Sequence, residues 1–418
     1  MAKSFSAYFS FLLVALVKVG SAAANFLVAV VISKKYPPEI AATFFFIQAF
    51  TLIVVGVSKL GLDNYSLRLE SRIHHSGRLT FIRESLAVCF FSGVFFSFLS
   101  YVGLMLYRPE VYVEGAGLVL LVSPCIACSY VLAFFSQARG RFVAQHCFLG
   151  LAANSIFLAL VFSGLNFGSV FWIYGVSWFV VFLFGFAVYR EDIFLIKYKL
   201  SINKVKKLVR YSTVFWGVGI LSMLMNWLPI FVSGFLLQNP EEVKAIAMSL
   251  RASLFIVFPL SVLGALWARR FASLYKQKQS EKLFKLYIKS TCTSLFMAIP
   301  ILVGLIVFSE EFLRFCDVDT VYSPVFRIIL VCQIIGVACG PIGLLMNMIG
   351  QERVVFLSSL FAVFFGFFVV VISYGEAGVY GVAYGVVSII LISNLLPLAR
   401  YLAGMKLSEI IGRQGLNR

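Results

Sequence analysis

Four basic side chains lie inside long apolar runs of this chain: Lys18, Lys59, Arg251 and Arg327. No Asp or Glu lies in the interior of these runs, and Glu39 is only the second residue of its run. Placing Lys or Arg at the centre of a membrane-spanning helix costs about 2.5–3.5 kcal/mol on insertion scales, so such residues are usually functional. A set of intramembrane cations with no acidic partner predicts that an anionic ligand enters the membrane interior.

Lys18 and Arg251 are the stronger candidates for binding such a ligand. Lys18 lies close to the middle of its apolar run, and Arg251 lies about 6 Å from the centre of its own run by the helical rise. A guanidinium donates to phosphate oxygens in a planar, multidentate geometry, which favours a phosphorylated ligand over a sugar or a metal ion. We therefore predict that these two residues bind phosphate groups. The alternative for Lys18 is a structural lysine bonded to carbonyls of a neighbouring helix.

The other two cations have a simpler interpretation. Lys59 lies at one end of its run, and Arg327 lies four residues inside the end of another. Long basic side chains in such positions can extend to the membrane surface. We favour that interpretation for both, and keep both as candidates for lining a cavity.

Polar residues inside the apolar runs are further candidates for lining a cavity. Ser21 and Asn25 follow Lys18 at the spacing of one helical face, so this stripe should not face lipid. The candidates in other runs are Gln48, Ser222, Asn226, Gln333 and Asn347. The last two share a stripe with Gly340, which is equally compatible with close packing of two helices.

The elements that must hold these residues are membrane helices. The 418 residues are 61% hydrophobic and only 13% charged, which excludes a soluble domain. Apolar stretches of about 20 residues recur, each long enough to cross the hydrocarbon core as a helix, and they lack the alternation of a β-barrel. We predict an all-α polytopic membrane protein with twelve membrane-spanning helices. Their expected ranges are 8–33, 38–60, 84–106, 115–137, 148–165, 170–189, 211–237, 244–267, 286–308, 323–348, 354–374 and 378–399.

The distribution of basic residues predicts the orientation. Of the 35 Lys and Arg, 26 lie in the N-terminus, the C-terminal tail and the alternate loops on the same side. By the positive-inside rule both termini are cytoplasmic. The net charge of +17 is then explained by loops that face anionic membrane lipids, and it does not predict a nucleic-acid partner.

The polar stretch 190–210 divides the chain into two sets of six helices. An offset of 202 residues aligns Pro38 and Glu39 with Pro240 and Glu241. This and similar matches predict a parallel repeat, with an N-terminal lobe at 1–200 and a C-terminal lobe at 201–418, as in many secondary transporters.

Chemistry typical of enzymes is not indicated. The three histidines, His74, His75 and His146, lie in or beside loops predicted to be cytoplasmic. Cys125 and Cys128 have the spacing of a metal or redox pair, but no second pair completes a site, so we interpret them as small apolar residues. With no Walker-type loop either, we expect a transporter without a cofactor or metal, and its coupling ion, proton or sodium, stays unassigned.

Several stretches resemble O-antigen and capsule flippases of the Wzx type. They include Leu-Val-Lys-Val-Gly-Ser at 16–21, Gly-Leu-Asp-Asn at 61–64, Gln-Ala-Arg-Gly-Arg-Phe at 137–142 and Tyr-Gly-Val-Ala-Tyr-Gly at 380–385. These motifs are typical of the superfamily of multidrug, oligosaccharidyl-lipid and polysaccharide exporters. The resemblance implies a V of two six-helix lobes, as in multidrug (MATE) exporters, around a central cavity that opens alternately to each side.

The resemblance also implies a function. It predicts a flippase that moves undecaprenyl-pyrophosphate-linked oligosaccharide repeat units from the cytoplasmic to the periplasmic leaflet of the bacterial inner membrane, for O-antigen or related polysaccharides. Lys18 and Arg251 match basic residues on helices one and eight that are thought to hold the pyrophosphate in related flippases. A polysaccharide polymerase and a chain-length regulator are the implied protein partners.

Two other functions are compatible with the sequence. A multidrug or small-metabolite exporter of the same superfamily is the first, although that branch typically has a carboxylate in the first lobe and the run around Lys18 has none. An integral-membrane glycan polymerase is the second. It is disfavoured because the longest predicted external loop, 309–322, is short for a catalytic loop.

Overall fold

A computed structural model describes residues 2–70, 75–107, 119–164, 169–191, 202–237 and 239–415. Within these ranges the regular structure is helical, with no strand. Twelve helical segments are long and apolar enough to cross a membrane, which confirms the predicted all-α fold with twelve spans. The sixth, Val170–Val188, differs from its predicted range by one residue at one end, whereas the fifth, Phe142–Phe162, begins six residues before its predicted start.

The helices pack into two compact units, Met1–Gly234 and Phe235–Arg418. The division falls near the end of helix α10 (Ile202–Leu236), so nearly all of α10 belongs to the first unit. The lobe boundary predicted at residues 200 and 201 lies outside the described residues, and the division into lobes stays a prediction.

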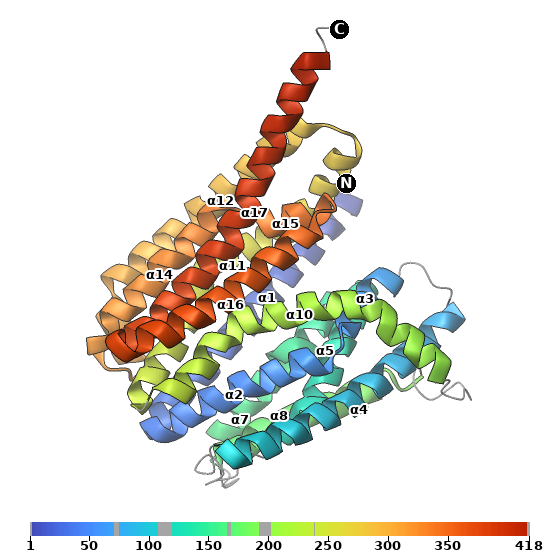
Figure 1. The fold of residues 1–418 in the computed structure, drawn as a ribbon. Helices are drawn as coiled ribbons and strands as arrows, with labels where there is room; N and C mark the ends of the chain where they lie inside the picture. Colours follow the sequence, from blue (N-terminus) through green and yellow to red (C-terminus); the bar gives the residue numbers. More distant parts are fainter. Residues whose placement is uncertain are drawn as a thin grey trace. The chain divides into compact units, whose positions relative to one another are not determined.

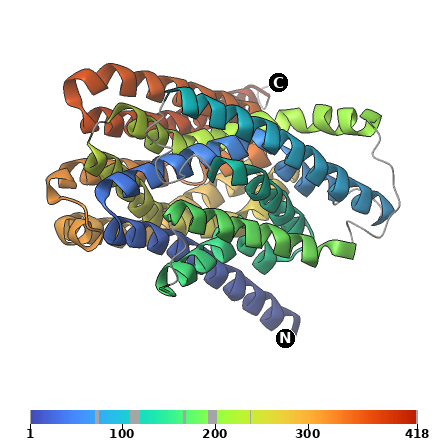
Figure 2. The same cartoon turned by 90° about the horizontal axis from the view of Figure 1, so that it is seen from below.

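The first unit contains α1 (Ala2–Lys35), α2 (Pro38–Ser58), α3 (Leu62–Glu70), α4 (His75–Tyr107), α5 (Ser123–Ala138), α6 (Phe142–His146), the π-helix η2 (Cys147–Leu151), α7 (Ala152–Phe162), α8 (Val170–Val188) and most of α10. The second contains α11 (Pro240–Lys276), α12 (Ser280–Val307), α13 (Ser309–Phe315), the 3-10 turn η3 (Thr320–Tyr322), α14 (Ser323–Ala338), α15 (Ile342–Met348), α16 (Glu352–Ala377) and α17 (Val379–Gly415). In Figure 2, α1 extends as one continuous helix from the N-terminus, in dark blue.

The core of the first unit forms around α2 and α5. Their spans are 72% and 78% buried, whereas the span of α4 is only 22% buried and exposes apolar side chains such as Phe91 and Leu106. At the centre of the core, the ring of Phe44 on α2 lies 6.0 Å from that of Phe157 and 5.4 Å, edge-on, from that of Tyr174. A helix that is apolar on every face, as α2 is, must be surrounded by other helices.

The chain bends sharply after α2. Leu60 and Gly61 have left-handed φ angles of 47° and 74°, and α3 starts directly afterwards. α11 begins at Pro240, which the offset of 202 residues matches to the first residue of α2, Pro38. Yet α11 continues without a break to Lys276. The bend therefore distinguishes the first half of the proposed repeat from the second.

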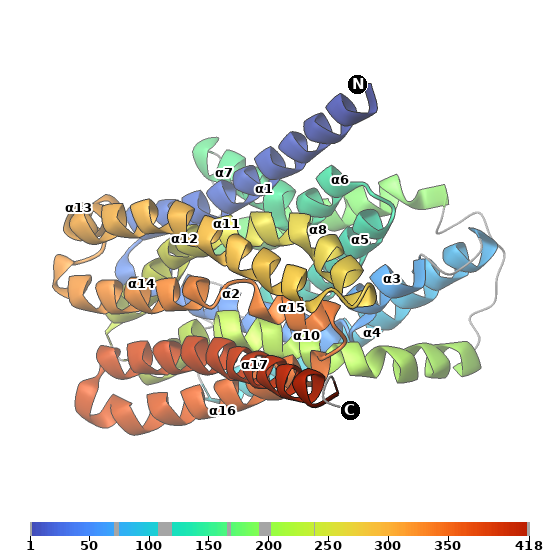
Figure 3. The same cartoon turned by 90° about the horizontal axis from the view of Figure 1, so that it is seen from above.

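In the second unit, α12, α14, α17 and α16 lie side by side (Figures 1 and 3). The predicted tenth helix is interrupted there: α14 ends at Ala338, Gly340 has a φ of +63°, and α15 starts at Ile342. The break leaves the carbonyl of Cys339 without a helical partner. The hydroxyl of Tyr287 on α12 donates a hydrogen bond of 2.5 Å to this carbonyl. A Cβ at position 340 would lie 2.0 Å from Oγ1 of Thr291, so glycine is required at this break.

This interruption corrects one expectation. Gln333 lies on α14 and Asn347 on α15, so the polar stripe predicted on a single continuous helix does not exist. The fifth span is irregular too. It passes from α6 through η2 to α7, and Gly150 has a φ of +133° inside η2.

Candidate functional site

The polar stripe of α1 is partly accessible. Lys18, Ser21 and Asn25 each have intermediate exposure. α1 packs against α6, η2 and α7 of the first unit. The residues predicted to share one helical face therefore share an intermediate environment, neither sealed in the core nor fully exposed.

His146 lies close enough to Lys18 for their charges to interact. We expected His146 in or beside a loop, but it is the last residue of α6, inside the candidate span Phe142–Phe162. It lies four residues, or about 6 Å by the helical rise, from the start of that span.

Lys59 does not reach the membrane surface, which corrects the interpretation favoured from the sequence. Its side chain is 3% exposed, and Nζ lies 2.5 Å from Oδ2 of Asp63, which is 2% exposed. The ammonium also lies 4.9 Å from the centre of the Tyr130 ring, a favourable cation–π distance. A second buried carboxylate, Glu84, is 7% exposed inside the candidate span Phe81–Leu106. The first unit therefore does contain buried acidic groups.

The bend after α2 brings Asp63 to Lys59. Gly61 packs against the backbone of α10: a Cβ there would lie 2.4 Å from the Trp216 nitrogen and 2.5 Å from the Ser212 oxygen. The indole of Trp216 donates a hydrogen bond of 2.9 Å to the carbonyl of Val57, so α10 also holds the last turn of α2.

In the second unit, Arg251 lies on α11 and is 6% exposed. Lys244, the first residue of the predicted range 244–267, is even more buried, at 1%. Its Nζ lies 3.0 Å from Glu241 and 3.4 Å from Asp317. Each unit thus has one almost fully buried lysine bound to acidic side chains.

Arg327 reaches outward, in keeping with the interpretation favoured from the sequence. Its side chain is 44% exposed. Nε donates a hydrogen bond of 2.8 Å to Oγ of Ser309, and Nη2 lies 3.9 Å from Oε1 of Glu310. These partners precede the span of Arg327 in the segment predicted to be external.

The remaining polar candidates differ in accessibility. Gln48 is 4% exposed in the interior of α2. Ser222 and Asn226 are exposed on α10, one turn apart, and the amide of Asn226 donates to the Ser222 carbonyl. Gln333 is partly exposed and Asn347 is exposed. Of this group, Ser222 and Asn226 are the two that are exposed on one face of a single helix.

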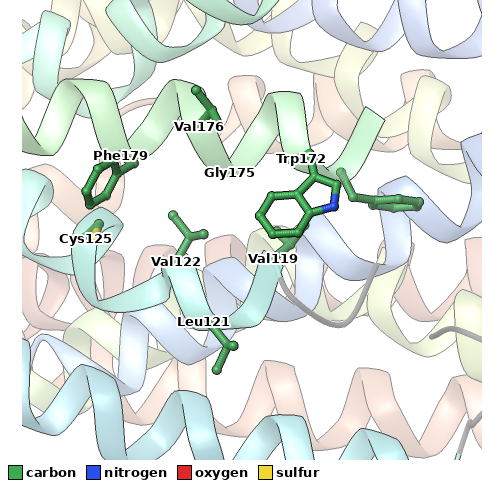
Figure 4. Close-up of a pocket in the computed structure, with 9 residues that line it drawn as sticks. Val119, Leu121, Val122, Cys125, Trp172, Gly175, Val176 and Phe179 are labelled. Atoms are coloured by element: carbon green, nitrogen blue, oxygen red, sulfur yellow. The ribbon is translucent and has the colours of Figure 1, made fainter. Parts of the chain in front are cut away.

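Cys125 and Cys128 are buried among apolar groups. Cys125 lines a pocket of about 300 Å³ between α5 and α8, together with Trp172 and Phe179 (Figure 4). The thiol of Cys128 donates to the carbonyl of Leu86 at 3.7 Å. In the part of the chain that the structure describes, no group of three His, Cys, Asp or Glu side chains could hold a metal ion.

The described residues thus contain twelve candidate spans in two compact units, with buried cations in each unit. No family model matches this sequence, and no curated protein matches it. Several solved structures do have the same fold. The lipid II flippase MurJ in an inward closed conformation is 16% identical, covers 93% of this chain and 87% of its own, and has a TM-score of 0.68.

Transporters of the multidrug resistance MATE family, from the MOP superfamily, are similar to the same degree. An inward-facing structure is 13% identical over 95% of this chain and 99% of its own, with a TM-score of 0.65. An outward-facing structure is 18% identical over 96% of both chains, with a TM-score of 0.64. At these identities the likeness establishes a shared fold, common to a lipid flippase and to multidrug transporters.

Proposed function

We propose that this protein is a flippase for undecaprenyl-pyrophosphate-linked oligosaccharides of O-antigen or related polysaccharide synthesis. The observation that carries the proposal is Lys18, a partly exposed cation in an apolar span, on a face shared with Ser21 and Asn25. The fold that the chain shares with a lipid II flippase supports a lipid-linked substrate.

In this proposal Lys18 and Arg251 bind the pyrophosphate, the glycan occupies a polar cavity and the polyprenyl chain stays in lipid. Lys18 is partly accessible, whereas Arg251 is 6% exposed, so the surroundings of Arg251 must open before it can meet a ligand. A ligand that binds both residues would stabilise the conformation in which both are accessible, and its release would favour the other. Such differential stabilisation is what alternating access requires.

Location, direction and partners follow from the same proposal. The protein would lie in the bacterial inner membrane with both termini in the cytoplasm, and it would act beside a polysaccharide polymerase and a chain-length regulator. Transport would run down a gradient or be coupled to an ion, proton or sodium, that stays unassigned.

A multidrug or small-metabolite exporter is the second candidate, and the similarity to MATE transporters favours it. Asp63 is a buried carboxylate in the first unit, but Lys59 neutralises it. A cationic drug is therefore attracted to Asp63 less strongly than to an ionised carboxylate that has no counter-charge.

The test is complementation of a bacterium that lacks the gene. Lys18→Ala and Arg251→Ala should each abolish surface polysaccharide at normal membrane protein levels, because removing a charge-assisted hydrogen bond weakens binding roughly 10- to 150-fold. Lys18→Arg should retain activity, and Arg251→Lys, which keeps the charge but loses the multidentate geometry, should retain part of it. Lys285→Ala, which changes an exposed lysine, should be fully active. Full activity of both alanine variants would overturn the site. Unchanged polysaccharide with altered drug tolerance in the deletion strain would establish the exporter.

A further inference from the structure

A cleft of about 450 Å³ lies between α4 and α8 of the first unit. It is lined by Phe90, Phe182, Leu183, Phe186, Ala187 and Arg190. The rings of Phe90 and Phe182 stack across it with centroids 6.3 Å apart, and Phe182 meets Phe186 edge-on at 4.7 Å. These ring contacts hold an aromatic wall in place before any ligand binds.

The cleft runs along α8 toward the end of its span. Phe182 and Phe186 lie one turn apart on one side of α8, and Arg190, just beyond the end of this helix, lines the same cleft. The two phenylalanines lie inside the candidate span Val170–Val188, and Arg190 lies two residues beyond it. The aromatic wall and the guanidinium of Arg190 therefore follow one another along the membrane normal. The guanidinium lies at the end predicted to be cytoplasmic.

Arg190 is available to a ligand. Its side chain is exposed, and within the described ranges it makes no ion pair or hydrogen bond with the protein, including its neighbour Glu191. This distinguishes it from Lys59 and Lys244, whose charges are neutralised inside the protein.

The surface around the cleft is the kind that faces lipid. Phe91 on α4 is 71% exposed, and Leu183 on α8 is 51% exposed. A second apolar pocket of this unit, lined by Trp172 among others (Figure 4), has no charged residue in its lining. Of the two, only the cleft ending at Arg190 combines an apolar wall with a charge.

We propose that this cleft binds a phospholipid with an anionic head group. One acyl chain lies against the phenylalanines, and the phosphate and head group meet Arg190. The site is on α4 and α8, whereas the proposed substrate residues lie on α1 and α11, so the inference does not depend on the proposed substrate.

The expected selectivity is modest. A basic residue near an anionic membrane surface contributes about 1 kcal/mol, which corresponds to a roughly fivefold preference for an anionic lipid over a zwitterionic one with the same chains. The apolar wall contributes equally to both lipids.

The test measures lipid retention by the purified full-length protein in native mass spectrometry. Delipidated protein is mixed with dioleoyl-phosphatidylglycerol or dioleoyl-phosphatidylcholine. We expect about fivefold stronger retention of phosphatidylglycerol, which Arg190→Gln abolishes. Arg353→Gln, a change of an exposed arginine on the same predicted side of the membrane, leaves the preference intact.

Two further measurements keep the test decisive. Ala187→Trp should fill the cleft and reduce retention of both lipids, while glycerol phosphate, which carries the anion alone, should not compete. Equal retention of the two lipids by the wild type, or an undiminished preference in Arg190→Gln, would overturn the proposal. So would unchanged retention in Ala187→Trp, or competition by glycerol phosphate.

Discussion

The Lys59–Asp63 pair leads to a quantitative prediction about stability. Asp63→Asn leaves the Lys59 ammonium, 3% exposed, without its counter-charge. Removing one partner of a buried ion pair costs about 3–5 kcal/mol, because the remaining charge is then uncompensated. Since the new amide oxygen still accepts a hydrogen bond, we expect the lower end, about 3 kcal/mol. This is a roughly 150-fold change in the ratio of folded to unfolded protein.

A double-mutant cycle separates this effect from a general loss of packing. Lys59→Met also leaves a buried charge, that of Asp63. Combining both changes removes both charges, so the double variant should be more stable than the sum of the single losses predicts, by about 2–3 kcal/mol. The neighbouring ring of Tyr130 is unchanged throughout the cycle.

The measurement is unfolding in mixed micelles followed by tryptophan fluorescence. Trp216 is a suitable probe because its indole binds the carbonyl of Val57, two residues before Lys59. Lys285→Met is the matched control: it breaks a second pair at the same spacing, with Glu281, but one that is 73% and 80% exposed. We expect the control to unfold like the wild type, because a fully solvated ion pair contributes little to stability. Strict additivity in the cycle, or wild-type stability of Asp63→Asn, would refute the reasoning.

Two glycines allow further tests of stability by the same unfolding measurement. Gly61→Ala should cost more than about 2 kcal/mol, because a left-handed residue gains a Cβ 2.4 Å from the backbone of Trp216, which cannot move aside. Gly340→Ala should cost a similar amount, but Thr291→Ala should partly rescue it, since the closest contact, at 2.0 Å, is with that side chain. Gly20→Ala, with nothing within 4 Å of the added Cβ, should be neutral or stabilising by up to about 1 kcal/mol. A larger loss at position 20 than at 61 would contradict this account.

The spans were predictable because length and apolarity alone define them. A run such as Val170–Val188 has a single stable solution in hydrocarbon, in which every backbone group is bonded within one helix. Interruptions of a membrane-spanning helix were harder to predict. Neighbouring helices satisfy the backbone groups that an interruption leaves unbonded. At Cys339 the Tyr287 hydroxyl does so, from a residue 52 positions away in the chain. Gly340 followed by Pro341 was nevertheless a local signal for a break.

The partner of Lys59 had a signal in the sequence as well. Asp63 follows it by four residues, the spacing of an ion pair on a helix, but it lay beyond the predicted end of the helix at residue 60. His146 was assigned to a loop for a similar reason, since its span was predicted to begin at 148. In both cases a boundary error of a few residues separated a charged group from its neighbour. The burial of Arg251 and Lys244 had no such signal, because it depends on packing between distant segments.

The closeness of Lys59 and Asp63 along the chain affects how the second span enters the bilayer during synthesis. An isolated lysine in an apolar segment opposes insertion, by about 2.5–3.5 kcal/mol when it lies centrally. Its counter-charge is only four residues away, so the pair can form as soon as this one segment has left the ribosome. Lys244 has a local partner in Glu241, whereas its second partner, Asp317, is synthesised 73 residues later. Each buried lysine can thus be neutralised by its own segment, and neither insertion step has to wait for the rest of the protein.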